Sequence, residues 1–593
     1  MVERKNLSSR WQMEKTKNHT GLVISCLLVA LALTTGSAQA ASILGEEWEK
    51  FLTERVKFGG FVDNTTGLAI GPDGDRRHFK TSNRFIMERF TIQPEFNAQM
   101  TDWAKFFISW RFVKEPRYNA EARSRRKSVS YFPTAPVQPL PNTFYDEDSP
   151  KPWEAVLDIL PTDRLAIRLG RQFISWGETD GLRLLDVINP QDSTFAPPVA
   201  PNLFDLDETR IPTWGIRMLY TAIPASSTTL ELVALPGFEE AKQRVDEVVG
   251  SNDTRDGIVR YGRWSAHPET RLIIAGRNAF GNLYANSLSP ASCAAPTIGC
   301  LVIPSTTRQL PDAGDNWKIG ARITHNIGKL NFGLGYIWGY NPQGADMVFK
   351  RKGAVTCSAP VAGPCLAGLA PSVVNLRLVN DRTHIFAGHF NYAVDEILSI
   401  PLNTAIRGEI AIYPQEPYNI SEFPGRNCAT GVLTGFRVGP RCKRGVEDSD
   451  SILEKNTLRY ALGFDRSILI PFLQDDPWRA FRMSFQIFQR IILDHEHGIH
   501  LFSTAEKIKK VSNFLTFRVS TGYRGDTILP DLFVGYDPAG YWSFNPAVSY
   551  APPWNEKIKL TLTAALYGGH NKFAFPGFFS EKDSVFLKMR YQF

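Results

Sequence analysis

The side chains best suited to binding a solute lie between residues 168 and 192, where the chain reads RLGRQFISWGETDGLRLLDVINPQD. Charged and amide groups alternate there with residues such as Leu182 and Leu185, and the stretch is too apolar for a solvated loop. We therefore predict that the loop from residue 176 to residue 211 folds into the interior of the protein. The candidate contact residues are Arg171, Gln172, Trp176, Glu178, Asp180, Arg183, Asp186, Asn189 and Asp192.

Two roles are open for these charges. They could line a constriction and contact a passing solute, because guanidinium groups and carboxylates form strong, directional ion pairs. They could instead belong to a plug and only pair with charges on the surrounding wall. Arg171 would share a face with Leu165, Ile167 and Leu169 if a regular strand continued, so we expect a bulge or a strand end near Gly170.

A second group of candidates consists of arginines on predicted strands, where alternation places them opposite the apolar face. Such arginines would bind carboxylates or phosphates in forked pairs and stay charged when half buried. Inward-pointing basic residues outnumber acidic ones, which indicates an arginine-lined interior. The alternative is that these arginines brace the wall by pairing with acids. The main candidates are Arg111, Arg407, Arg459, Arg482 and Arg518.

Other chemistry is weakly represented. His495, His497 and His500 form one histidine cluster, which is a weak metal candidate and more typical of a solvated turn. The chain has no GxSxG, Walker, dinucleotide-binding or HExxH motif, so we predict no cofactor, no enzyme activity and no nucleic-acid partner. A lipase-like or protease-like barrel enzyme ranks lowest, because the histidine cluster is its one possible base.

The elements that must position these residues are visible first at the C-terminus. Val585, Leu587, Met589, Tyr591 and Phe593 fall on one face of a strand, opposite a mainly polar face that contains Phe586. Such alternation, ending on an aromatic residue, is typical of the closing strand of an outer-membrane β-barrel, where one face meets lipid. We also expect the barrel assembly machinery to recognise the strand that ends in Phe593.

The N-terminus indicates export. Basic residues precede the apolar run 22–33, and Ala38-Gln39-Ala40 offers a cleavage site, so residues 1–40 are predicted to be a signal peptide. Translation could start at Met1 or at Met13. Residues 41–54 are a short periplasmic or plug segment with a helical pattern, and residues 55–593 form the barrel in the outer membrane of a Gram-negative bacterium.

Alternation and turn residues predict an all-β, transmembrane antiparallel barrel of about 16–20 strands. Short links, expected in the periplasm, fall near Pro552, Asp526, Asp475, Glu396, Gly328, Glu269, Ser226, Thr162 and Thr101. Long links, expected outside the cell, alternate with them, and one outer link near Pro538 is short. A barrel of this width would leak unless a segment fills its lumen. The candidate segments are residues 45–54 and the loop after Trp176.

The cysteines that follow the signal peptide fall into three local couples on the long links. An exported protein favours disulfides, and no spacing supports zinc. We therefore predict the pairs Cys293–Cys300, Cys357–Cys365 and Cys428–Cys442.

The segment 168–192 also resembles the signature of a proteobacterial outer-membrane family known as domain of unknown function 1302. The matching elements are Gly170-Arg171-Gln172, Trp176-Gly177-Glu178, Gly181-Leu182-Arg183, Asp186-Val187 and Asn189-Pro190. The resemblance implies an outer-membrane barrel that accompanies inner-membrane exporters and lipid, steroid or hydrocarbon metabolism. It supplies no catalytic residues.

The expected function is a channel or transporter for small hydrophobic or amphipathic molecules, including anionic ones, such as lipids, steroids or hydrocarbons. Export of an acidic polysaccharide is the alternative. Expected partners are outer-membrane lipids, lipopolysaccharide (through the basic runs 75–77 and 123–127), an inner-membrane exporter and a periplasmic lipid carrier. Direction of transport and oligomeric state stay open.

Overall fold

A computed structural model of the chain describes most of the predicted barrel. The described residues are 54–70, 85–114, 152–180, 182–191, 206–237, 301–302, 306–309, 316–340, 346–354, 372–379, 382–397, 400–419, 452–496, 508–570 and 583–593. The predicted signal peptide and the segment 41–53 lie outside them, and so do all three cysteine couples. In this part of the chain no helix is long and apolar enough to span a bilayer.

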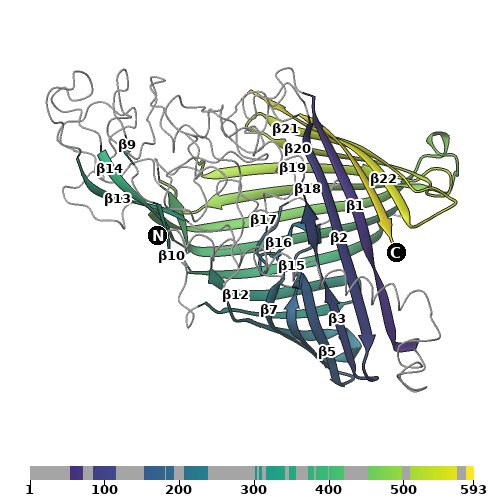
Figure 1. Cartoon of the computed structure of the whole chain (residues 1–593), viewed down its shortest axis with the longest axis horizontal. Coiled ribbons are helices and arrows are strands. Elements are labelled where there is room, and N and C mark those ends of the chain that lie inside the picture. Colours follow the sequence, from purple (N-terminus) through teal and green to yellow (C-terminus); the bar gives the residue numbers. More distant parts are fainter. Residues whose placement is uncertain are drawn as a thin grey trace, which may run out of the picture.

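The fold is a closed antiparallel β-barrel of 18 strands, within the predicted range. Its strands are β1 (Val56–Ala69), β2 (Phe85–Gln99), β3 (Ala104–Ser109), β4 (Phe112–Lys114), β5 (Glu154–Thr162), β6 (Leu165–Gln172), β7 (Thr213–Ile223), β8 (Thr228–Leu235), β11 (Lys318–Ile327), β12 (Leu330–Tyr340), β15 (Arg382–Ile397), β16 (Ile400–Asn419), β17 (Ile452–Leu469), β18 (Ala480–Ile492), β19 (Val511–Ser520), β20 (Ile528–Asp537), β21 (Tyr541–Tyr550), β22 (Ile558–Gly569) and β23 (Ser584–Gln592). Because β3 and β4 together form one strand, these 19 elements make 18 strands; each strand pairs with its neighbour in the ring, and β1 pairs with β23 to close it (Figure 1).

The elements β3 and β4 form one interrupted barrel strand, because both pair with β2. The interruption at Trp110 lies opposite Pro94, whose carbonyl accepts a hydrogen bond from the Trp110 N–H at 3.2 Å. Proline has no N–H to return the second bond, so the ladder is broken there. The barrel strand that follows the predicted link near Thr101 is therefore divided in two.

A smaller sheet stands apart from the barrel ring. It contains β9 (Leu301–Val302), β10 (Thr306–Gln309), β13 (Asp346–Ala354) and β14 (Ser372–Val379). Figure 1 shows it at the end of the barrel opposite the C-terminus. We call that end the loop end, and the end that holds the short links the turn end.

The predicted alternation of short and long links agrees with the described strands. The links after β2, β5, β7, β11, β17, β19 and β21 are short and lie at the same end as Phe593, whose N–H bonds to the Gly60 carbonyl at 3.0 Å. The predicted turn near Glu269 lies outside the described residues. Strand β8 pairs directly with β11, so no additional pair of strands enters the ring between them.

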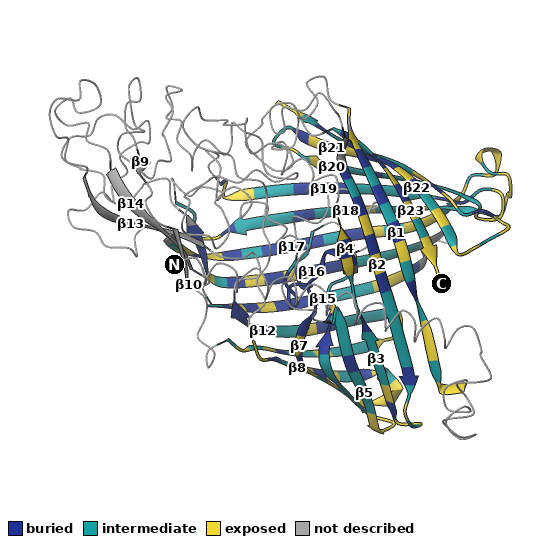
Figure 2. Ribbon diagram, viewed as in Figure 1, coloured by how far each residue is buried: buried dark blue, intermediate teal, exposed yellow. Residues whose placement is uncertain are grey.

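The two faces of the sheet have opposite chemistry, and buried and exposed residues alternate along the strands (Figure 2). On β23, Leu587, Met589 and Tyr591 are exposed, whereas Phe586 and Lys588 are buried on the inner face. The same alternation gives an outer band of exposed apolar side chains, among them Val62, Phe90, Ile92, Ile216, Met218, Leu232, Ile323, Leu334, Phe386, Ile410, Val548 and Leu562. Lipid on the outside and a polar interior explain this pattern.

We expect Leu587→Arg to destabilise the folded barrel in lipid by about 2–4 kcal/mol, because Leu587 lies midway along β23 on the outer face. Tyr591→Arg, on the same face but near the turn end, should cost only about 0–1 kcal/mol. Reversible unfolding from phospholipid vesicles in guanidinium measures both values. Equal costs at the two positions would contradict the assignment of the outer face.

Candidate functional site

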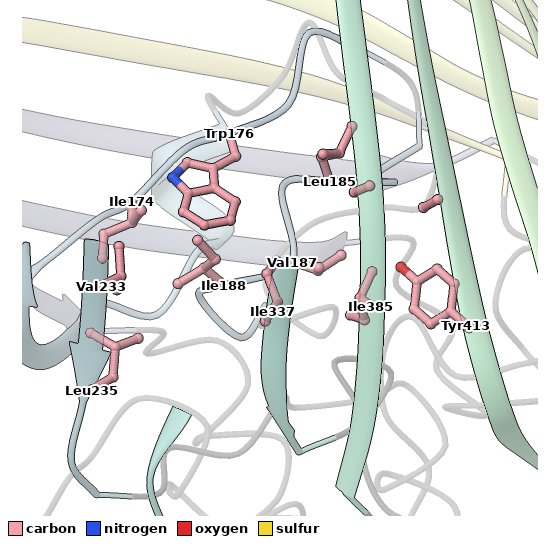
Figure 3. Close-up of a cluster of buried hydrophobic side chains, with 12 residues drawn as sticks. Ile174, Trp176, Leu185, Val187, Ile188, Val233, Leu235, Ile337, Ile385 and Tyr413 are labelled. Atoms are coloured by element: carbon pink, nitrogen blue, oxygen red, sulfur yellow. The ribbon is translucent and has the colours of Figure 1, made fainter. Parts of the chain in front are cut away.

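The link between β6 and β7 folds into the barrel, as predicted. We call residues 173–212 the plug; the structure describes 173–180, 182–191 and 206–212 of it. Its apolar side chains are buried against inward-facing side chains of β8, β12, β15 and β16 (Figure 3). The cluster comprises Ile174, Trp176, Leu185, Val187 and Ile188 from the plug and Val233, Leu235, Ile337, Ile385, Ala387, Ala411 and Tyr413 from the wall. Burial of this apolar surface accounts for the stability of the plug inside a wet barrel.

Trp176 is the largest apolar side chain of the plug, and its position depends on two wall glycines. A Cβ atom on Gly320 of β11 would lie 2.8 Å from the indole ring, and one on Gly335 of β12 would lie 3.4 Å from it. Arg322 lies 5.1 Å above the ring and donates to the Trp176 carbonyl at 3.3 Å. The glycines therefore leave the space that the indole fills.

Asn189 ties the two ends of the plug together. Its Oδ1 accepts from the Ile174 N–H at 2.7 Å, and its Nδ2 donates to the carbonyls of Gln172 and Ile211 at 3.0 and 3.1 Å. The Gln172 side chain in turn donates to the Gly215 carbonyl of β7 at 3.0 Å. These buried amides hydrogen-bond to backbone groups of the plug and of the strands beside it, so they hold the base of the plug.

Glu409 of β16 fastens the middle of the plug to the wall. Its carboxylate accepts from the backbone N–H groups of Glu178, Thr179 (2.9 Å) and Leu185 (3.2 Å). The Tyr413 hydroxyl donates to the Leu184 carbonyl at 3.1 Å, and Lys318 Nζ donates to the Ile188 carbonyl at 2.7 Å. The wall thus binds the plug mainly through the plug's main chain.

Asp180 lies at the plug tip, which we define as Asp180 and Leu182; Glu178 and Thr179 belong to the middle of the plug, which Glu409 holds. Its Oδ2 accepts from Arg407 and from Gln486 Nε2, the latter at 2.9 Å, and its N–H donates to Gln486 Oε1 at 3.2 Å. Arg407 also donates to the Glu178 carbonyl and pairs with Asp465 at 2.6 Å. The Asp180 side chain is 53% exposed, unlike the buried contacts at the base of the plug.

Asp186 holds two plug arginines. It pairs with Arg210 and lies 3.4 Å from Arg183, which also donates to the Asn189 carbonyl at 2.8 Å. Burial lowers the pKa of Arg183 below its ordinary value, and the Asp186 carboxylate opposes that shift. These charges pair within the plug itself.

The far end of the plug contains a short helix, α6 (Leu206–Thr209), which is fastened to the opposite wall. Glu208 pairs with Arg590 and, at 3.0 Å, with Lys588 of β23; Arg111 donates to its carbonyl at 3.0 Å. Burial alone would raise the pKa of Glu208, but Lys588, Arg590 and Arg111 hold it below its ordinary value. The plug is therefore attached to both sides of the barrel.

The five predicted arginines face the interior, and four of them have clear partners there. Arg111 lies 3.9 Å above the Trp153 ring; Arg459 pairs with Glu416 and lies 4.1 Å above the Tyr413 ring. Arg518 donates to Asp531 at 2.6 and 2.9 Å, and Arg407 pairs as described above. Bracing by acids, the alternative reading of the arginine bias, thus describes most of these contacts.

Most of the acidic residues that make these contacts were not predicted from the sequence. Glu416 follows a bulge after Tyr413, where Gln415 has φ 53°, so its face is the reverse of the one that alternation assigns. Glu208 comes from the plug, where alternation says nothing. Asp63 of β1 lies 2.7 Å from Arg590 and could have been found from the alternation of that strand.

Of the two features expected near Gly170, the structure has the strand end, because β6 ends at Gln172, and not the bulge. The φ of Gly170 is +124°, and β6 keeps its register with β5 and β7 through Arg171. A Cβ there would lie 2.0 Å from the Ala155 carbonyl, so glycine permits the close approach. Arg171 is buried, and its Nε donates to the Trp153 carbonyl at 3.2 Å.

Several predicted residues lie outside the described part of the chain: Asp192, Gly181, His497 and His500, together with the three cysteine couples. His495 is described, and its Nε2 lies 2.7 Å from the Ile508 carbonyl. Within the described residues, no group of three or more His, Cys, Asp or Glu is placed to hold a metal ion.

A cavity of about 690 Å³ lies beside the plug tip at the turn end. Its lining includes Asp180 of the plug and wall residues of β15–β19, among them Arg407, Asp465, Arg482, Ser484 and Arg518. Arg482 is exposed on this side. The cavity is where predicted plug and wall candidates come together.

A family model described as "Protein of unknown function (DUF1302)" matches residues 22–593. The chain is similar to Pseudomonas aeruginosa OpdK, crystallised with vanillate, at 8% identity and a TM-score of 0.40, over 92% of this chain and 99% of that chain. It is also similar to Acinetobacter baumannii OccAB3 at 8% identity and a TM-score of 0.42, over 91% and 99%. No curated protein matches the chain.

We expect Glu409→Ala to loosen the plug, because it leaves buried backbone N–H groups without an acceptor at about 1.5–3 kcal/mol per bond to a charged group. Glu409→Gln keeps one acceptor oxygen and should have an intermediate effect. Single-channel recording in planar bilayers should show more frequent opening for the alanine variant. Indistinguishable traces for all three proteins would contradict this fastening role.

We expect Gly320→Ala to displace Trp176 and destabilise the plug by about 1–3 kcal/mol through overpacking. Gly335→Ala is the matched control, since its new Cβ would meet the same ring at 3.4 Å. Thermal unfolding in detergent and opening frequency in bilayers measure the effect. A larger effect from Gly335→Ala than from Gly320→Ala would refute the placement of the indole.

Proposed function

We propose a transport function for this chain, which belongs to the DUF1302 family of proteins of unknown function. The barrel is an outer-membrane channel for small hydrophobic or amphipathic molecules, with the turn end in the periplasm. Anionic amphipathic molecules fit its interior best. Lipids, steroids and hydrocarbons with an acidic group are the cargo class that follows.

The observation that carries this proposal is a barrel crossed by a fastened plug that leaves a charged cavity at the turn end. The cavity of about 690 Å³ has the size of a site for one small molecule. The plug and the wall beside it present both an apolar cluster and guanidinium groups. This combination suits a molecule that has an apolar body and one charged group.

Export of an acidic polysaccharide is less well supported. A hydrated polymer needs a wide, continuous path, and the plug is attached to wall strands on both sides of the lumen. Most inward arginines are already paired with acids, as at Arg459 and Arg518. The interior is therefore less cationic than the basic residues alone would suggest.

Proteoliposome flux tests the proposal. We expect slow but saturable passage of a small steroid carboxylate through the full chain, and negligible passage of alginate oligosaccharides. A variant in which a glycine–serine linker of equal length replaces residues 174–188 should pass the carboxylate faster and show a large, steady conductance. Absence of small-molecule flux in both proteins would overturn the proposal, and faster passage of the polymer would favour polysaccharide export.

A further inference from the structure

We propose that Asp180 occupies a binding site for anions, which we call the seat and which Arg407 and Gln486 form. The carboxylate of an amphipathic molecule displaces Asp180 from this site and so releases the plug tip. The inference rests on the proposed transport function and deepens it. It assigns the site of the anionic group, the site of the apolar body and the event that opens the plug.

The seat belongs to an ordered array of side chains on four adjacent strands. Ser467, Arg482 and Ser520 are paired across β17, β18 and β19 and form the row nearest the turn end. The next row contains Asp465, Ser484 and Arg518, and the third contains Arg407, Gly463, Gln486 and Thr516. Successive inward rows lie about 7 Å apart along a strand. The three arginines therefore lead from the mouth of the cavity to the plug tip.

The wall of this array has a surplus of positive charge. Arg407 pairs with Asp465, and Arg518 directs two nitrogens to one oxygen of Asp531. Arg482 is exposed in the cavity and makes no ion pair with the acids among the described residues. Two wall carboxylates thus face three guanidinium groups in these rows, and Arg466 adds a fourth to the cavity lining. Asp180, which comes from the plug, adds a third carboxylate.

The groups that bind the Asp180 carboxylate would bind the carboxylate of a free molecule in the same way. One oxygen is held by a guanidinium group and a side-chain amide, from Arg407 and Gln486. These are donors that recognise any carboxylate with suitable access. Half of the Asp180 side chain is exposed, and ion pairs of that kind are weak because solvent screens them. An anion that enters the cavity can therefore compete for the same donors.

The apolar body of such a molecule also has a place next to the seat. One row beyond Arg407, β17, β18 and β19 carry Ala461, Phe488 and Phe514 beside Glu409 of β16, and the plug covers the three apolar residues with Leu184 and Leu182. When the plug tip moves away, Leu182 leaves this cluster and uncovers part of it within one row of the guanidinium group, while Leu184 stays in place. A carboxylate followed by an apolar chain matches this order. An inorganic anion would meet only the first half of the site.

The rest of the plug stays attached to the wall while an anion displaces Asp180. Asn189 and Glu409 hold the base and the middle through buried hydrogen bonds to the main chain. The tip is held by the half-exposed ion pair of Asp180, whereas the base and the middle of the plug are held by buried hydrogen bonds. Displacement of Asp180 therefore moves the tip while the plug stays attached.

The test uses the full chain in planar bilayers with sodium octanoate, and with sodium chloride at equal ionic strength as the reference. Octanoate should raise the open probability of the parent protein in a saturable manner. Asp180→Asn should open several-fold more often without octanoate and respond little to it, since the amide cannot replace the charge on Arg407. A parent-like Asp180→Asn channel would overturn the inference.

Arg482→Gln provides a second variant in which the plug tip keeps all its contacts. It should need roughly tenfold more octanoate to open, because one charged hydrogen-bonding group is lost from the cavity mouth. Lys559→Gln is the matched control: Lys559 is an exposed, inward residue near the turn end on β22, away from this cavity. Equal shifts for both variants would indicate general electrostatics and refute the site.

The two proposals fail in different ways. If the linker variant of residues 174–188 carries no small-molecule flux, the transport function itself is wrong. If that flux is present and the Asp180 and Arg482 variants behave as the parent does, transport stands and the anion seat is wrong.

Discussion

The structure depends on the requirement that no backbone N–H or C=O group be left unpaired in lipid. A bilayer core offers no water, so a sheet can span it only if its first and last strands pair. Here β1 and β23 pair from Phe61 with Gln592 to Ala69 with Ser584. Closure sets the faces of every strand, because residues two apart must share either lipid or the lumen.

A ring of 18 strands encloses more space than wall side chains can fill, and this explains the plug. The plug has no ladder partners for much of its main chain. The wall supplies them through side chains: Glu409, Tyr413, Lys318 and Arg322 all bind plug backbone atoms. Residues of the family signature therefore have a structural task here. Gln172, Trp176 and Asn189 are buried and hold the plug, whereas Asp180 stays half exposed.

The charges inside the barrel follow the same division. Buried cations such as Arg459 and Lys588 are paired with acids, because an unpaired charge in that position would be costly. Among the described residues, Arg482 is a cation that makes no ion pair and lies where water has access. Buried arginines of the interior thus stabilise the wall, whereas arginines that water can reach are available to bind a solute. The plug tip lies between these two groups.

Much of this architecture was determined by the sequence alone. Period-two alternation is a local property, so the outward Leu587 and the inward Lys588, the short links and the inward arginines could all be predicted. The apolar content of residues 182–188 also indicated a plug. Partners could not be predicted in this way, because they depend on which strands close the ring and on local breaks in alternation. The bulge before Glu416 reversed a face, Gly320 made space for Trp176 from a strand more than 140 residues away, and Asp180 met Arg407 only after closure. Contacts between distant segments are decided by the geometry of the closed sheet, which no short stretch of sequence contains.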